Sequence, residues 1–254
     1  TGPLATSWHS NKFINPQKDG AILPILHLNG YKIANPTVLS RLPKERLQSL
    51  FNGYGYKVHF VEGSDPEKMH KLMAKTMDEC IKEIRDLQHR ARELGKDSIN
   101  ADWPMIVLRT PKGWTVPKLV DGKQIEGTFR AHQVPVTMDS QEHLEILREW
   151  LKSYRPEELF DENYKLKAEI AEILPKGDKR ISASPYANGG ILLKELKTPN
   201  LSKVAVKFKG HGTVKAQDML ELGGYIKELF VLNEKNNNFR IFSPDEAMSN
   251  RLYK

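Results

Sequence analysis

Three short apolar runs in the first half of the chain have the pattern of buried β-strands. They cover residues 21–28, 56–61 and 104–108 and are bounded by turn-forming residues. Short apolar runs of this kind are typical of parallel strands covered on both faces. The first run contains Pro24, which cannot donate a ladder hydrogen bond, so we expect its paired part to begin at about Ile25.

Helical patterns separate the three runs. Leu42 to Phe51 predicts a short helix that closes at Gly53. Asp65-Pro66 is a typical helix start, and apolar residues then recur at three- and four-residue steps until Gly95. This stripe is rich in methionine, which can indicate a binding groove but is far more common in core packing. The alternation of strands and helices predicts an α/β fold with a doubly wound parallel sheet.

The second half of the chain has weaker patterns. Residues 141–154 predict an amphipathic helix, residues 156–173 carry further helical signal, and residues 174–200 have the proline and glycine content of a connection. Beyond it we expect a strand at 204–206, a helix at 214–232 and a strand at 239–242. The predicted domains are therefore 1–174, a connection at 175–200, and the beginning of a second α/β domain at 201–254.

Composition narrows the class of protein. The formal charge of +7 over 254 residues favours anionic partners, but it is dispersed, so a nucleic-acid-binding domain is a weak hypothesis. No apolar run approaches the ~20 residues of a membrane span, and no secretory signal pattern is present. The single cysteine, Cys80, excludes an internal disulfide and a cysteine-based zinc site, which makes a reducing cytoplasm the expected location.

The stretch from His27 to Thr37 follows the first strand and has two interpretations. Asn29 offers an amide oxygen, Gly30 allows close approach of the backbone, and the next carbonyls are free to bind a hard cation. Ligands of open α/β sheets gather at the carboxyl ends of the strands, where this loop would lie. The alternative is an ordinary strand exit with a turn-forming Asn-Gly.

Several blocks of sequence resemble the phosphoketolase family, in that family's order and over essentially the whole chain. They are Thr-Gly-Pro-Leu-Ala-Thr-Ser-Trp-His-Ser-Asn-Lys-Phe at 1–13, His-Leu-Asn-Gly-Tyr-Lys-Ile at 27–33, Thr-Pro-Lys-Gly-Trp at 110–114, Phe-Arg-Ala-His-Gln-Val-Pro at 129–135, Ser-Tyr-Arg-Pro-Glu-Glu-Leu-Phe at 153–160 and Pro-Asp-Glu-Ala-Met-Ser-Asn-Arg-Leu at 244–252. Because the chain begins and ends without typical domain boundaries, we expect it to be an internal fragment.

The resemblance implies a lyase of carbohydrate metabolism that depends on thiamine diphosphate and Mg²⁺ (or Ca²⁺). It implies cleavage of xylulose 5-phosphate, and also fructose 6-phosphate, with inorganic phosphate to give acetyl phosphate plus glyceraldehyde 3-phosphate or erythrose 4-phosphate. It also implies a sheet of the thiamine-diphosphate-binding type, with the latter part of a diphosphate-binding domain at 1–174 and the beginning of a pyrimidine-binding domain at 201–254. The expected assembly is a homodimer or higher oligomer with the active site between subunits.

The resemblance also assigns the cofactor site. Asn29 and the Tyr31 backbone carbonyl match the second half of the family's metal motif, whose Gly-Asp-Gly half we expect just before Thr1. Magnesium prefers six hard oxygens, which these groups would supply in part. Lys112 would place a positive charge near the cofactor's diphosphate or the substrate. Without the resemblance, Lys112 would be interpreted as a solvated lysine in a turn.

The remaining assignments concern catalysis and the substrate. His132 is the expected catalytic group, since imidazole can move a proton near neutral pH, and Gln133 beside it is a weaker substrate-binding candidate. Ser249 and Arg251 match the place where related enzymes hold the sugar phosphate. The other histidines, His27 included, are expected to be structural or surface residues.

A second hypothesis is that the chain alone is a non-catalytic fragment. The resemblance places the glutamate that activates the cofactor beyond residue 254, and half of the metal motif is expected before residue 1. The preferred ketose, the oligomer size and any allosteric effector do not follow from the sequence.

Overall fold

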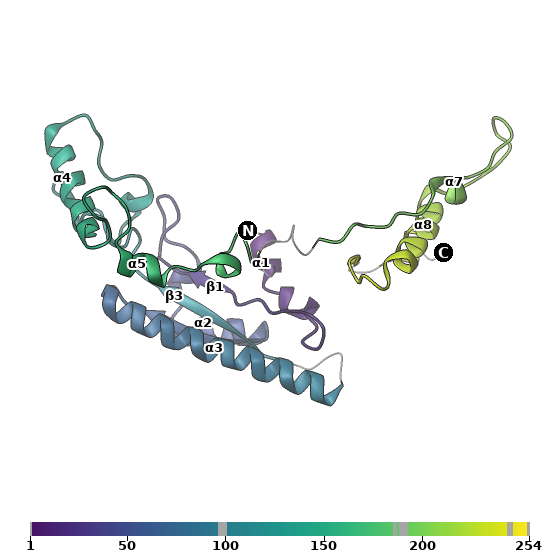
Figure 1. The fold of residues 1–254 in the computed structure, drawn as a ribbon, viewed down its shortest axis with the longest axis horizontal. Helices are drawn as coiled ribbons and strands as arrows, with labels where there is room; N and C mark the ends of the chain where they lie inside the picture. The colour runs from purple at the N-terminus through teal and green to yellow at the C-terminus, as the bar shows by residue number, and fades with distance from the viewer. Residues whose placement is uncertain (1, 96–100, 185–186, 188–192, 243–245, 253–254) are drawn as a thin grey trace. The chain divides into compact units, whose positions relative to one another are not determined.

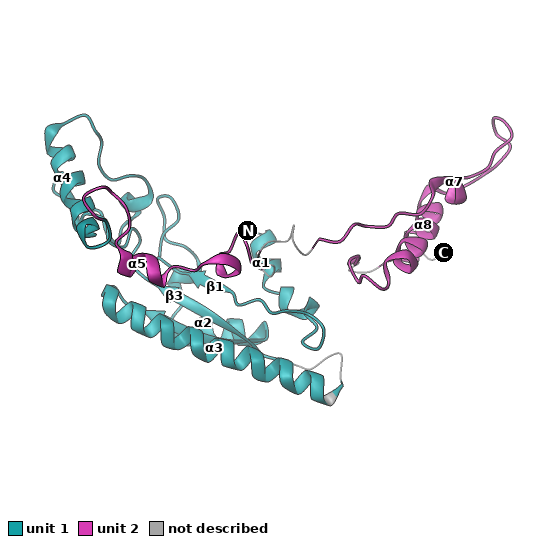
Figure 2. Ribbon diagram, viewed as in Figure 1, with its two compact units in different colours: residues 1–160 teal, residues 161–254 magenta. Residues whose placement is uncertain are grey.

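The computed structural model describes residues 2–95, 101–184, 187, 193–242 and 246–252. It forms two compact units, residues 1–160 and 161–254, which we call unit 1 and unit 2 (Figure 2). The predicted domain limits at residues 174 and 200 stay a prediction.

Unit 1 is organised around a parallel sheet with the strand order β1-β3-β2. The strands are β1 (Ile25–His27), β2 (Tyr56–Glu62) and β3 (Trp103–Arg109), and β3 lies in the middle (Figure 1). The pairing begins at Ile25, as predicted, although the carbonyl of Pro24 still accepts a hydrogen bond of 2.9 Å from the Ile106 N–H. Pro24 therefore accepts a hydrogen bond in the ladder, although it has no N–H group with which to donate one.

Two helices cover opposite faces of this sheet. Trp103, Met105 and Val107 of β3 share one cluster with residues of α2 (Lys44–Gly53). Ile106, between them, belongs to a second cluster with residues of α3 (Pro66–Leu94). Because successive strand residues point to opposite faces, α2 covers one face and the first half of α3, with Met69 and Cys80, covers the other, while Leu87 of α3 joins the first cluster. The predicted α/β fold is confirmed.

Helix α3 begins and ends where the sequence predicts. The Asp65 side chain accepts a hydrogen bond from the Lys68 N–H, and Gly95 adopts the left-handed conformation that ends many helices. Cys80 on this helix is fully buried in the second cluster. Burial, and then the nearby Glu83 and Glu79 carboxylates, raise the pKa of the Cys80 thiol to about 11. These surroundings suit a packing role for the thiol.

The rest of unit 1 consists of short elements and one further helix. They are α1 (Gly2–Ser7), the 3₁₀ helices η1 (Ser10–Phe13), η2 (Leu39–Arg41), η3 (Phe129–His132) and η4 (Pro156–Glu158), the hairpin strands β4 (Leu119–Val120) and β5 (Lys123–Gln124), and α4 (Gln141–Lys152). Val120, Ile125 and Val136 form a third buried cluster against which Ile146 and Leu147 of α4 pack. This cluster supports the segment that carries η3.

Unit 2 contains the helices α5 (Ala168–Ile173), α7 (Leu201–Val204) and α8 (Asp218–Asn233), and the 3₁₀ helix η5 (Gly177–Lys179). The predicted strand at 204–206 is wrong, because Asn200 accepts a hydrogen bond from the Ser202 N–H and starts a helical turn there. The predicted strand at 239–242 is also wrong: the described residues of unit 2 include no strand with which it could pair. The continuation of that strand into residues 243–245 lies outside the described residues.

The helical signal at 156–173 is interrupted. The Asp161 carboxylate accepts hydrogen bonds of 2.9 Å from the N–H groups of Asn163 and Lys165, and this turn separates η4 from α5. Side-chain bonds of this kind compete with a continuous helix. Across the described ranges, the helices are all too short or too polar to cross a membrane.

Candidate functional site

The carboxyl ends of β1 and β3 bring four of the predicted site residues together. β1 and β3 are neighbours in the sheet, so the loop after β1, with Asn29 and Tyr31, lies beside the loop after β3, with Lys112. His132 joins them from η3 through a contact with Lys112. This is the edge of an open α/β sheet at which ligands bind.

The loop after β1 is a small, hydrogen-bonded turn. Thr37 and Gly30 are linked by a 2.9 Å bond from N–H to carbonyl, and Lys32 and Asn35 by another of 2.9 Å. The Asn29 side-chain oxygen accepts a hydrogen bond of 3.2 Å from the Tyr31 N–H. Gly30 has φ of +95°, which glycine adopts without strain. The Tyr31 carbonyl accepts no hydrogen bond from the described residues, so it is available to a ligand.

Lys112 is a buried cation with neutral partners. Only 7% of its surface is exposed, and its Nζ donates to the Lys32 carbonyl and contacts His132 Nδ1 at 3.3 Å. No carboxylate of the described chain forms an ion pair with it. Burying an ammonium without a counter-charge is costly, so this arrangement favours an anionic ligand.

His132 is oriented by Lys112. An ammonium group can only donate, so Nδ1 accepts and the proton of the neutral imidazole lies on Nε2. The His132 residue is exposed, which leaves that group accessible to a substrate. Thr128 starts η3 by accepting a hydrogen bond from the Arg130 N–H. The geometry suits donation of a hydrogen bond from Nε2–H to a bound molecule.

The loop after β3 and η3 meet at Gly113. This residue has φ of +64°, and a Cβ at this position would overlap the Cβ of Ala131. Glycine is therefore required on two grounds, conformation and space. Lys112 directly precedes Gly113, and His132 directly follows Ala131. The close approach of Gly113 to Ala131 therefore brings His132 to Lys112.

The sequence analysis missed two residues of this site, His27 and Thr110. His27 Nε2 and Thr110 Oγ1 are 2.8 Å apart, and Thr110 is 7% exposed. Each lies two residues before a predicted site residue, Asn29 and Lys112. The shared two-residue spacing could have indicated His27 and Thr110, but only if β1 and β3 were known to be neighbours in the sheet. Along the chain, β2 lies between them.

The other predicted residues are placed as follows. Gln133 directly follows η3 and is exposed. Ser249 and Arg251 lie in unit 2, where both are exposed and Ser249 Oγ donates to the Glu246 carbonyl at 3.1 Å. Their participation in one site with Lys112 stays a prediction.

The loop after β1 has the donor type that Mg²⁺ prefers. It offers the Asn29 amide oxygen and the Tyr31 carbonyl, both hard oxygen ligands. The Thr37 hydroxyl oxygen is buried without a hydrogen-bond partner in the described structure, so the loop has a further unsatisfied polar atom. The described residues contain no cluster of three or more His, Cys, Asp or Glu that could hold a metal. The loop thus fits part of a magnesium shell.

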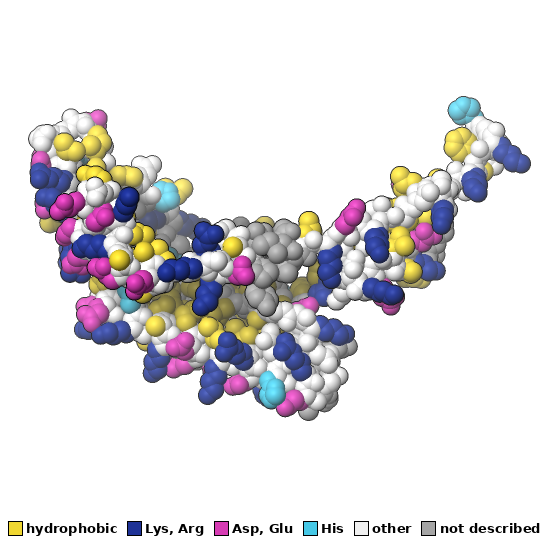
Figure 3. Space-filling model, in the orientation of Figure 1, with side chains coloured by type: hydrophobic (Ala, Val, Ile, Leu, Met, Phe, Trp, Pro, Cys, Tyr) yellow, Lys and Arg dark blue, Asp and Glu magenta, His cyan; other side chains and the backbone are white. Residues whose placement is uncertain are grey.

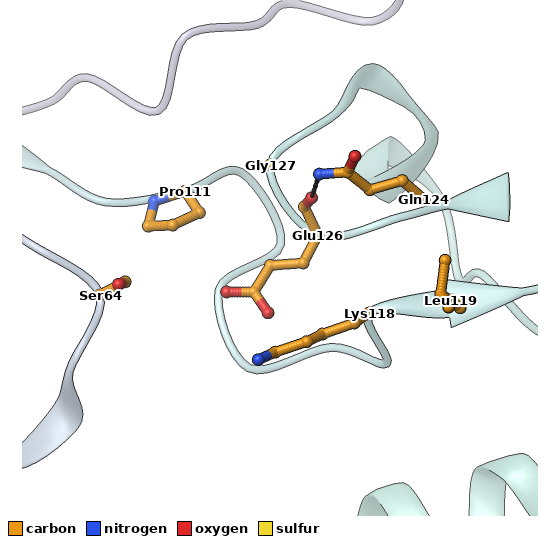
Figure 4. Close-up of a pocket in the computed structure, with 7 residues that line it drawn as sticks. All are labelled: Ser64, Pro111, Lys118, Leu119, Gln124, Glu126 and Gly127. Carbon is orange, nitrogen blue, oxygen red and sulfur yellow. Dashed lines mark hydrogen bonds between the residues drawn. The ribbon is translucent and has the colours of Figure 1, made fainter.

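A pocket of about 420 Å³ lies beside this site in unit 1. It is lined by Ser64 after β2, by Pro111 after β3, and by residues around the β4–β5 hairpin, and the Glu126 and Lys118 side chains extend into the same space (Figure 4). The Gly127 N–H donates to the Lys112 carbonyl at 2.8 Å, so the pocket wall is attached to the backbone of Lys112. The volume is within the range of small-molecule sites.

Charged side chains are mixed on the visible surface. Lys and Arg lie among Asp and Glu on both units (Figure 3). The dispersed charge predicted from the sequence therefore has its counterpart among the described residues of this face.

Known proteins similar to this chain belong to one family. Residues 1–192 match the XFP N-terminal domain, and residues 220–254 match the D-xylulose 5-phosphate/D-fructose 6-phosphate phosphoketolase family. A probable phosphoketolase of Clostridium acetobutylicum is 60% identical over 100% of the chain. Probable phosphoketolases 2 of Rhizobium meliloti and Nostoc sp. are 55% and 56% identical over 99% of it. The chain spans about a third (32%) of the length of each of these relatives.

Proposed function

Because the chain belongs to the phosphoketolase family, we propose that it forms part of an enzyme that cleaves xylulose 5-phosphate with inorganic phosphate. The products would be acetyl phosphate and glyceraldehyde 3-phosphate, with erythrose 4-phosphate formed from fructose 6-phosphate. The observation that carries the proposal is Lys112, a buried ammonium with neutral partners at the carboxyl edge of the sheet.

The proposed cofactors are thiamine diphosphate and Mg²⁺ (or Ca²⁺). When bound, the cofactor supplies the carbanion chemistry that breaks the carbon–carbon bond. The Asn29 side chain and the Tyr31 carbonyl would bind the metal, and Lys112 would neutralise diphosphate or substrate charge. These groups lie on a loop and a strand end that are fixed by the hydrogen bonds described above.

His132 is the proposed catalytic group. Its Nδ1 accepts from Lys112, so its Nε2–H would donate a hydrogen bond to a substrate oxygen. Gln133 would add an amide contact beside it. Ser249 and Arg251 would bind the sugar phosphate, with a hydroxyl and a bidentate guanidinium as donors.

We further propose that the enzyme is a homodimer or higher oligomer with the active site between subunits, located in the cytoplasm, and that neither nucleic acid nor a membrane is a partner. We expect the 254-residue chain alone to be inactive. The loop after β1 provides two neutral oxygen ligands and no carboxylate, whereas protein sites for Mg²⁺ are usually built on one or two carboxylates.

The test uses a full-length protein, as long as the relatives, that contains this 254-residue sequence. With thiamine diphosphate, Mg²⁺ and phosphate, it should form acetyl phosphate from xylulose 5-phosphate. Lys112→Met should weaken cofactor or substrate binding about 10- to 100-fold, since a hydrogen bond to a charged group is lost. His132→Gln should lower kcat about 100-fold or more.

Exposed residues of α3 provide matched controls. Lys75→Met and His89→Gln alter side chains that are 75% and 72% exposed, and both should leave turnover unchanged. Absence of acetyl phosphate with every cofactor present would reject the proposed function. Equal effects of Lys112→Met and Lys75→Met would reject the site.

A further inference from the structure

The strands β1 and β3 diverge just before the candidate site. Their last backbone contact is the 2.8 Å bond from the Leu28 N–H to the Leu108 carbonyl. Beyond it, one chain continues into the loop of Asn29 and the other into the loop of Lys112. Two side-chain contacts still link them, one from Lys112 Nζ to the Lys32 carbonyl and one between His27 and Thr110.

Thr110 depends on His27 for its hydrogen bond. The threonine is 7% exposed, and a buried hydroxyl without a partner is costly. His27 Nε2, at 2.8 Å, is the partner that the described structure provides. The β-branched side chain of threonine has few rotamers, so the pair links the two backbones with little freedom.

β1 has few other attachments on the face of His27. It is an edge strand of three residues, and Ile25, on the same face as His27, is 49% exposed. On the other face, Leu28 is 7% exposed and packs in the apolar cluster of Met105 and Val107. The contact between His27 and Thr110 therefore complements Leu28 and fixes the His27 face where the chain enters the Asn29 loop.

We propose that His27 is a positioning residue that holds the Asn29–Lys32 segment in place against Lys112. Through Thr110, it sets the spacing between the oxygens of the loop and the ammonium group. The expected effect on cofactor binding rests on the proposed function, which assigns the loop oxygens to the metal and the Lys112 ammonium to the diphosphate.

The first measurement is amide hydrogen exchange in the full-length protein without cofactor. His27→Ala and Thr110→Val should each speed the exchange of the Lys32 and Thr37 amides, which bond within the loop, about 3- to 10-fold. The double variant should match the single variants, because either substitution removes the same bond. Thr110→Ser keeps the hydroxyl and should exchange like the wild type.

The second measurement is the titration of thiamine diphosphate and Mg²⁺. Both single variants should raise the apparent Kd about 3- to 10-fold, the double variant should do no more, and kcat at saturating cofactor should stay within about twofold. His89→Ala, which removes an exposed histidine of α3, should change neither exchange nor Kd.

The outcomes separate this inference from the proposed function. Unchanged loop exchange in His27→Ala would overturn the positioning role, and so would additive effects of the two substitutions. A wild-type protein that binds no cofactor would reject the proposed function, while the exchange experiment would still decide whether His27 positions the loop. A kcat that falls in His27→Ala at saturating cofactor would also contradict a positioning role.

Discussion

Unit 1 and unit 2 are stabilised in different ways. Unit 1 buries β3 between two helices and has three apolar clusters. Among the described residues of unit 2, few are buried: Pro199, Gly223, Leu229 and Asn233. One unit has a hydrophobic core of its own, whereas the other relies on isolated contacts.

Asn233 is the main polar contact of unit 2. Its side chain is 2% exposed; it accepts a hydrogen bond from the Lys197 N–H and donates to the carbonyls of Lys197 and Leu229. The Asn233 amide thus attaches an extended segment to α8, and Asn238 donates to the carbonyls of Lys194 and Glu195 in the same segment. The comparison indicates that groups fixed on the sheet of unit 1 have defined positions, while the conformation around α8 depends on very few side chains.

The largest expected effect is in the core of unit 1. Ile106→Ala removes a fully buried side chain and should lower the free energy of unfolding of unit 1 by about 2–5 kcal/mol. All four tryptophans lie before residue 161, so tryptophan fluorescence during urea unfolding reports on this unit. Ile181→Ala, at a position that is 81% exposed, should have little effect. A similar loss in both variants would contradict the described core.

The next effect is in unit 2. Asn233→Ala leaves the Lys197 N–H and carbonyl without their partner and should cost about 1–3 kcal/mol of local stability. Amide hydrogen exchange of peptides around residues 197 and 229–233 is the measurement. Asn236→Ala, in the same segment, is the control. If exchange in unit 1 increased as much as in unit 2, the two units would not be independently stabilised.

The smallest effect concerns an ion pair that joins β2 to α3. Burial by itself raises the pKa of Glu83, but hydrogen bonds from Lys57 and His59 outweigh it and the net pKa is lowered. A carboxylate with a lowered pKa stabilises the fold above its unfolded pKa of about 4.3, and this contribution is lost as the pH falls through the folded pKa.

Glu83→Gln should therefore destabilise unit 1 at pH 7 by about 1 kcal/mol or less and reduce the loss of stability on acidification. Thermal unfolding at pH 7 and in the acidic range measures both effects. Glu67→Gln, whose carboxylate pairs with Lys71 on the exposed face of α3, should change little. If Glu83→Gln left the pH dependence of stability unchanged, the ion pair of Glu83 would make no contribution to the stability of unit 1.

The success of the sequence analysis differed between the units for a physical reason. In unit 1, strands buried on both faces and a capped helix follow local rules, so β1, β2, β3 and α3 were predicted closely. In unit 2, short apolar runs at 204–206 and 239–242 resembled strands, but a strand needs a partner that local sequence does not specify. At 204–206 the Asn200 cap starts a helical turn instead. The Asp161 turn likewise interrupts the helical signal at 156–173.

The candidate site was predictable only in part. The resemblance selected Asn29, Lys112 and His132, and the structure places them together, although their roles stay predictions. His27 and Thr110 were missed, because their contact depends on β1 lying next to β3 rather than next to β2. Hydrophobic periodicity identifies strands but does not give their order in the sheet.

The close approach of Gly113 to Ala131 has a consequence for directed evolution of the site. A library that varies the neighbours of His132 changes the shape of η3, and position 131 tolerates only a small side chain while it faces Gly113. Larger residues at either position would separate the histidine from its lysine before any chemistry was altered. Positions 113 and 131 are therefore best varied as a pair, or kept fixed while selection acts on exposed positions such as Gln133.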